Sequence, residues 1–99
     1  MIRHVIIWTL RDDLSDEDKK IKSAEIKEKL EALRGVVDGL TDIKVHIGLL
    51  GTSNADIMLE STFESRETLA GYQVHPEHLK AAAVVKSAVS HRSCADFEV

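Results

Sequence analysis

Hydrophobic and polar residues alternate along four short segments of the chain, and this two-residue period predicts four β-strands. The predicted strands are residues 2–10, 42–50, 56–63 and 89–98. The first segment is rich in β-branched and aromatic residues, and both of its faces carry large apolar groups. A strand of this kind is typically covered on both sides. One chain offers helices for only one side, so we expect a second subunit to cover the other.

A helical period separates the first two strands. Ile26, Leu30 and Leu33 are spaced to form one apolar stripe, and the opposite side is rich in Lys and Glu. Ser15 is suited to cap the start of this helix. Gly35 is the natural place for it to end, because glycine readily adopts the left-handed conformation of a helix terminus.

A second helical region follows Ser65 and is interrupted at Pro76, the only proline in the chain. Proline lacks a backbone N–H, and its ring pushes the preceding residue, His75, out of the α-conformation. Proline is well tolerated at the first position of a helix. We therefore expect a new helix to begin at Pro76 and to run toward Ser87, with His78 in its first turn.

The resulting order is β-α-β-β-α-β over one domain, residues 1–99. This order predicts an α+β, ferredoxin-like subunit with helices on one face of a four-stranded antiparallel sheet. Together with the apolar second face of the first strand, it predicts a homodimeric α+β barrel.

Composition narrows the classes of partner. The net charge is −4 and no basic stripe alternates with aromatic residues, so we expect no nucleic-acid partner. No apolar run is long enough to cross a membrane and no signal-peptide pattern opens the sequence, which predicts a cytoplasmic protein without a membrane partner. A single cysteine, Cys94, excludes an internal disulfide.

The sequence predicts a small-molecule pocket between the sheet and the helices. Its lining would be apolar with a few convergent polar groups, which is typical of such pockets. The expected lining residues are His4, Ile6, Trp8, Ile57, Leu59, Phe63 and His75. Tyr72 and His78 are the candidate acid/base pair, because a helix N-terminus disfavours imidazolium and leaves His78 able to accept a proton. The alternative is that Tyr72 belongs to the core and that both histidines only cap helices.

A metal site is the other candidate for these histidines. His75 and His78 are three residues apart and His4 could approach them. We expect no metal, because Pro76 breaks the helical register between the first two and no acid or cysteine is placed to complete the ligand set. We likewise expect no other cofactor.

The run Phe63-Glu64-Ser65 … Tyr72-x-x-His75-Pro76-x-His78, together with His4, resembles the stress-responsive dimeric α+β barrel (Dabb) family. The resemblance covers nearly the whole chain and implies a ferredoxin-like subunit that dimerises through its sheet. The family includes a plant polyketide cyclase that closes a linear tetraketide acid by an intramolecular aldol step. By this resemblance Tyr72 and His78 match its acid/base pair, and His4 matches a pocket histidine. Ile57 stands where that enzyme has a further pocket histidine, so the same substrate is not implied.

Three functions are therefore weighed. The first is a small-molecule-binding protein with cofactor-independent acid/base chemistry, in which the ligand is apolar or bears a carbonyl group. The second is a non-catalytic stress-response or assembly module. The third, from analogy of fold alone, is a cofactor-independent monooxygenase.

Overall fold

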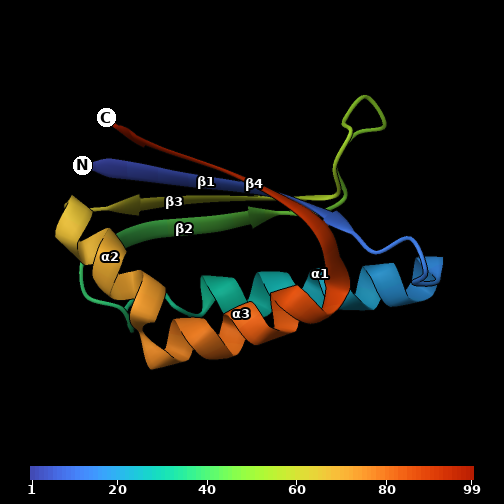
Figure 1. Cartoon of the computed structure of the whole chain (residues 1–99), viewed down its shortest axis with the longest axis horizontal. Helices are drawn as coiled ribbons and strands as arrows, with labels where there is room; N and C mark the ends of the chain where they lie inside the picture. The colour runs from blue at the N-terminus through green and yellow to red at the C-terminus, as the bar shows by residue number, and fades with distance from the viewer.

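The computed structural model describes all 99 residues and shows one four-stranded antiparallel sheet with every helix on the same side of it (Figure 1). The elements in chain order are β1 (Ile2–Leu10), α1 (Asp16–Glu31), β2 (Leu40–His46), β3 (Ile57–Phe63), α2 (Arg66–Val74), α3 (Pro76–Ala88) and β4 (Val89–Glu98). The strand order is β2-β3-β1-β4. The predicted ferredoxin-like α+β fold is confirmed. No helix is long and apolar enough to cross a lipid bilayer.

Strand β1 lies inside the sheet and pairs with both β3 and β4. Ile6, for example, lies opposite Leu59 on one side and Cys94 on the other. The even-numbered residues of β1 face the helices and are buried, whereas Ile7 on the opposite face is 39% exposed. The helices therefore cover one face of β1, and the apolar groups of its other face are open in the single chain.

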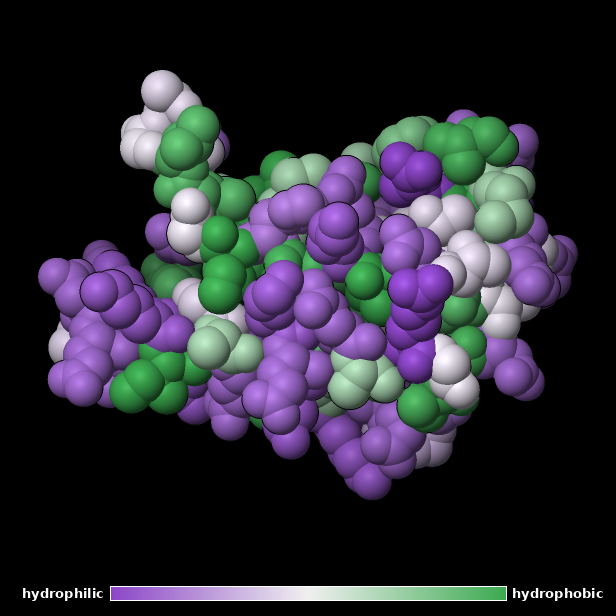
Figure 2. Space-filling model, turned by 180° about the vertical axis from the view of Figure 1, so that it is seen from behind, coloured by the Kyte–Doolittle hydropathy of each residue, from purple (hydrophilic) through white to green (hydrophobic).

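The two termini lie side by side, because the N–H of Val99 donates to the carbonyl of Met1 at 3.0 Å. Figure 2, which views the molecule from behind, shows hydrophobic side chains gathered at this end against a largely hydrophilic surface. The large hydrophobic residues exposed there are Met1, Phe97 and Val99.

Helix α1 begins as predicted but ends earlier. The Ser15 hydroxyl accepts from the N–H of Asp18 at 3.0 Å and caps the start. The helix ends at Glu31, so the expected end at Gly35 is wrong by four residues. Tight turns follow, with the N–H of Leu33 donating to Leu30 and that of Val36 donating to Leu33. Leu33 remains buried in the core within these turns, so the apolar stripe continues beyond the last residue of the helix.

Strand β2 runs over Leu40–His46, and the predicted strand 42–50 is therefore wrong at both ends. The strand ends two residues before Gly48, which adopts a φ of +63° that extended strands do not use. The apolar alternation continues to Leu49 in the sequence, but Ile47 is already 36% exposed. The predicted third strand, 56–63, begins one residue later, at Ile57.

The break at Pro76 is confirmed. His75 is extended, with φ −66° and ψ 132°, and separates α2 from α3. At the other end of α2, Ser65 and Thr68 form a capping box in which each side chain accepts from the other residue's backbone N–H. The two short helices therefore meet at an angle that a continuous helix would not allow (Figure 1).

Candidate functional site

A cavity of about 370 Å³ lies between the helix-facing side of the sheet and α3. Its walls are mainly apolar, and the hydrophobic residues that line it include Ile6, Trp8, Leu30, Leu59, Leu79 and Val85. The polar residues that line it are Tyr72, Gln73, His78, Lys86 and Arg92. An apolar enclosure with a few polar groups is the usual make-up of a small-molecule site, and the volume lies within the usual range.

Tyr72 and His78 face each other across the helix break. Their ring centroids are 4.0 Å apart and the ring planes are inclined by 35°. Tyr72 lies in the last turn of α2 and His78 in the first turn of α3, so the extended conformation of His75 between them sets this arrangement. The Tyr72 hydroxyl and Nδ1 of His78 are both buried without a hydrogen-bond partner. Buried polar atoms are rarely left unpaired, so this pair stands out from the rest of the core.

Burial shifts the protonation of the two groups in opposite directions. It raises the pKa of the Tyr72 phenol far above its ordinary value of 10.0. It lowers the pKa of His78 below 6.5, and the nearby Gln73 backbone opposes this only in part. At neutral pH the site therefore presents a protonated phenol, which donates, beside a neutral imidazole, which accepts.

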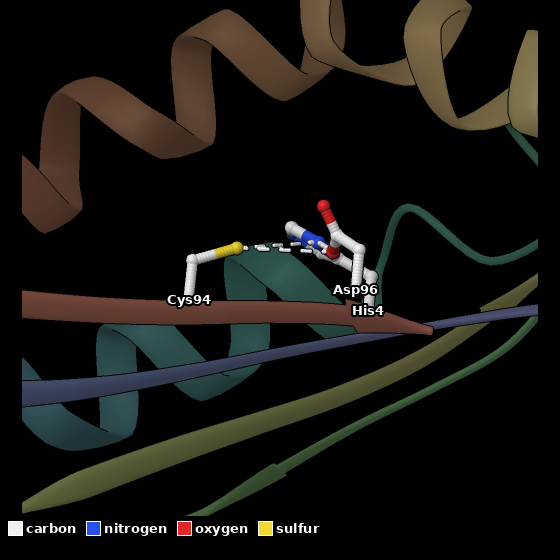
Figure 3. Close-up of side chains that lie close together, drawn as sticks. All are labelled: His4, Cys94 and Asp96. Carbon is white, nitrogen blue, oxygen red and sulfur yellow. Dashed lines mark hydrogen bonds and ion pairs between the residues drawn. The ribbon is translucent and has the colours of Figure 1, made fainter. Parts of the chain in front are cut away.

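Behind Tyr72 lies a second group of polar side chains. The His4 ring is 6.2 Å from the Tyr72 ring between centroids and is itself almost fully buried. Its Nδ1 is hydrogen-bonded to a carboxylate oxygen of Asp96 and lies 3.8 Å from Sγ of Cys94. Figure 3 shows the three side chains converging on the helix side of the sheet, His4 from β1 and the other two from β4. The expectation that no acid or cysteine is placed beside the three candidate histidines is therefore wrong for His4.

Some of the residues predicted to line the pocket do line the cavity, and others lie outside it. The cavity is lined by Ile6, Trp8, Leu59, Tyr72 and His78. His4, Ile57 and Phe63 are buried outside this lining, and Phe63 packs against Tyr72 with ring centroids 4.9 Å apart. His75 also lies outside the lining, because its Nδ1 accepts from the N–H of Glu77 at 3.1 Å and caps α3.

Sequence reasoning missed the two cations of the cavity. Neither Lys86 nor Arg92 was among the residues predicted to line the pocket, and both side chains are also exposed to solvent. Strand alternation places Arg92 on the face shared with Cys94 and Asp96, and its register opposite Trp8 brings it to the cavity. Neither cation is within ion-pair distance of a carboxylate, so both charges are free to meet a ligand.

Comparison with known proteins supports this description. The family model described as the stress responsive A/B barrel domain (Dabb) matches residues 2–99. A dimeric ferredoxin-like protein from Bacteroides fragilis superposes with a TM-score of 0.93 at 28% identity, over 99% of this chain and 95% of that one. An Arabidopsis thaliana protein superposes with a TM-score of 0.80 at 22% identity, over 100% of this chain and 95% of that one. The hydroxynitrile lyase from Passiflora edulis superposes with a TM-score of 0.74 at 16% identity, over 99% of this chain and 92% of that one. The search of curated proteins returned no match.

Proposed function

The chain belongs to the stress responsive A/B barrel domain family, and we propose that it binds a small apolar or carbonyl-bearing molecule between its sheet and its helices. The observation that carries the proposal is the pair of unpartnered buried polar atoms, the Tyr72 hydroxyl and Nδ1 of His78. Each such atom costs about 1–3 kcal/mol when it is left unpaired. A bound carbonyl oxygen would accept from the phenol and remove one of these costs.

The same geometry supports cofactor-independent acid/base chemistry, similar to that of a polyketide cyclase. Neutral His78 would take a proton from the carbon next to the bound carbonyl, and the electron pair of that C–H bond would move onto the oxygen. The Tyr72 phenol would donate to the oxygen as its charge develops. The resulting enolate carbon can attack a second carbonyl of the same molecule and form a carbon–carbon bond, which restores the first carbonyl and leaves the phenol of Tyr72 protonated. Protonated His78 then gives its proton to the new alkoxide oxygen.

The charge of the cavity adds to the description of the ligand. Lys86 and Arg92 bring two positive charges to a mainly apolar wall. A carboxylate on the ligand would pair with them, most favourably with the planar fork of the Arg92 guanidinium. The preferred ligand is therefore an apolar ketone that also carries an acid group.

The working unit of this proposal is a homodimer. The Bacteroides fragilis protein and a Thermobifida fusca protein with the same fold are both dimeric. In this chain the sheet face away from the helices leaves Ile7 and Phe97 exposed by 39% and 47%. A second copy packed on this face would cover them and leave the cavity, on the other side of the sheet, accessible.

The fold of the chain is compatible with catalysis, since one structural neighbour is a hydroxynitrile lyase. A protein that binds the same ligand without turning it over is the competing function. The two differ in one measurable property, which is the transfer of a proton from the ligand.

The experiment measures binding and proton transfer separately. Aryl methyl ketones with and without a carboxylate are incubated with the protein in D2O, and NMR follows ligand binding and the loss of the α-proton signal. Wild-type protein is expected to bind the ketones and to accelerate exchange, whereas His78→Ala should bind without exchange. His75→Asn keeps a capping side chain outside the cavity and serves as the control. Exchange that is equal in wild type and His78→Ala would refute the catalytic role, and absence of binding by every ketone would refute the site.

A further inference from the structure

We propose that His4, Cys94 and Asp96 form a binding site for a transition-metal ion, with Zn²⁺ as the best fit. The three residues offer an imidazole nitrogen, a thiol sulfur and a carboxylate oxygen, all within 4.8 Å of one another. These are the three donor types that zinc sites in proteins use, and the imidazole and thiolate favour zinc over magnesium or calcium. The site is distinct from the Tyr72–His78 pair and does not depend on the function proposed for it.

The sheet places these donors together. In the β1–β4 ladder His4 is paired directly with Asp96, and Cys94 lies one side-chain repeat earlier on the same face of β4. All three side chains therefore leave the sheet toward the helices (Figure 3). Cys94 and Asp96 are two residues apart on β4, and His4 lies on the neighbouring strand β1. The three donors are therefore held by hydrogen-bonded strands.

The distances suit tetrahedral coordination. Typical Zn–S and Zn–N lengths at a tetrahedral angle separate the two donor atoms by about 3.6 Å. Sγ of Cys94 lies 3.8 Å from Nδ1 of His4 and 3.7 Å from the carboxylate oxygen of Asp96. Both values lie close to those expected around a common ion.

One contact must open for an ion to enter. His4 and Asp96 are now joined by a direct hydrogen bond, and donors on a shared zinc would stand about 3.4 Å apart. The imidazole is fixed in the core, but the Asp96 side chain is 40% exposed and is free to move outward by about 1 Å. The ion would then take the place of the hydrogen bond between His4 and Asp96, and the Cys94 thiol would release its proton to solvent to bind as a thiolate.

Three protein donors leave the fourth position of a tetrahedral ion for water or for a ligand atom, as in catalytic rather than structural zinc sites. The cluster lies one side-chain repeat along β4 from Arg92, which lines the cavity. The thiol and the carboxylate are accessible from solvent, which gives the ion a path of entry.

The test uses full-length protein stripped of metal with a chelator and then dialysed. Isothermal titration with Zn²⁺ is expected to show one ion per chain, and Co²⁺ is expected to give a thiolate-to-metal charge-transfer band in the near ultraviolet. Cys94→Ser should remove the band and weaken Zn²⁺ binding by more than the 10–100-fold typical of losing an outer-sphere partner. His75→Asn, which changes a histidine outside the cluster, should leave both signals unchanged.

Tyr72→Phe keeps the fold and the cluster, so it separates the two proposals: metal binding should persist in this variant even if ketone exchange is lost. Asp96→Asn provides a second ligand variant, and its circular dichroism spectrum shows whether it remains folded. Zn²⁺ binding of equal strength in wild type and Cys94→Ser, or a Co²⁺ spectrum without the thiolate band, would overturn the proposal. Failure of wild-type protein to bind either ion at micromolar concentration would overturn it as well.

Discussion

The ring of Tyr72 lies 4.0 Å from the ring of His78, although the two residues belong to different helices. Their contact depends on the extended backbone of His75, which Pro76 enforces. The result is a buried donor and a buried acceptor side by side, each without a partner in the chain.

The first prediction is that Tyr72→Phe stabilises the protein while it impairs proton transfer. Phenylalanine keeps the ring contacts with Phe63 and His78 and removes only the unpaired hydroxyl. We expect the free energy of unfolding to rise by about 1 kcal/mol, because an unsatisfied buried group carries a desolvation cost. Urea unfolding and the D2O exchange assay measure the two effects. A variant that is less stable than wild type by 1 kcal/mol or more would show that the hydroxyl is already satisfied.

The second prediction concerns Gly39, which joins the turn after α1 to β2. Its φ is +81°, and a Cβ at this position would clash with the side chain of Thr68 in the capping box of α2. Gly39→Ala is expected to lower the free energy of unfolding by about 1–3 kcal/mol through strain and contact. Gly71→Ala is the matched control, because Gly71 is an exposed helical residue with nothing near its Cβ position. It should raise stability by up to about 1 kcal/mol.

The sequence predicted the strand order in the chain, the helix caps and the break at Pro76, because each depends on local chemistry. Ser65 and Pro76 act through their own backbone neighbours, so their effect is visible without the fold. The end of α1 was not predictable in this way, because Leu33 and Val37 stay buried whether the chain is helical or turning.

The cluster of His4, Cys94 and Asp96 was also missed for a physical reason. Alternation along residues 89–98 puts Cys94 and Asp96 on one face of the strand, but it does not fix the partner strand or the register. Only the pairing of His4 with Asp96 in the β1–β4 ladder brings the donors within reach of one another. The same register brings Arg92 to the cavity, which a one-dimensional pattern does not show.

The third prediction concerns Glu31, which joins α1 to the free edge of β2. Its carboxylate accepts from the N–H of Val45 and from Lys27, both at 2.9 Å. Burial favours the neutral acid, but these two contacts outweigh it and hold the pKa of Glu31 below 4.5. We expect Glu31→Ala to lower the free energy of unfolding at pH 7 by about 1–2 kcal/mol.

The pH dependence of that loss has a definite sign. Because the pKa of Glu31 is lowered in the folded state, its contribution is present above the ordinary pKa of 4.5 and is lost as the pH falls through the folded-state value. The stability difference between wild type and Glu31→Ala should therefore shrink below about pH 4. Glu28→Ala, at an exposed position of the same helix, is the control and should have little effect at either pH. A constant difference from pH 7 to pH 3 would contradict this assignment.

The fourth prediction concerns assembly. Ile7 lies at the centre of the sheet face that no helix covers, so a charge there should prevent a second copy from packing. Ile7→Asp is expected to be a monomer by light scattering at micromolar concentration, where wild type should be a dimer that buries more than about 1,200 Å². Ile21→Asp, at a 58% exposed position on α1, should remain a dimer. A monomeric wild-type protein would contradict the predicted dimer. A dimeric Ile7→Asp variant would show that the interface lies on another face.

The central claim is that His78 is a neutral proton acceptor held beside the Tyr72 phenol at physiological pH. A ¹⁵N NMR titration of the His78 imidazole measures this directly, with His78→Gln used to assign its signal. Burial predicts a pKa below the ordinary value of 6.5, so proton exchange from a bound ketone should fall as the pH drops through that pKa. Because Tyr72 contributes to this burial, a change of its hydroxyl should perturb the His78 signals. A His78 pKa above about 7, with imidazole signals that are the same in wild type and Tyr72→Phe, would contradict the account.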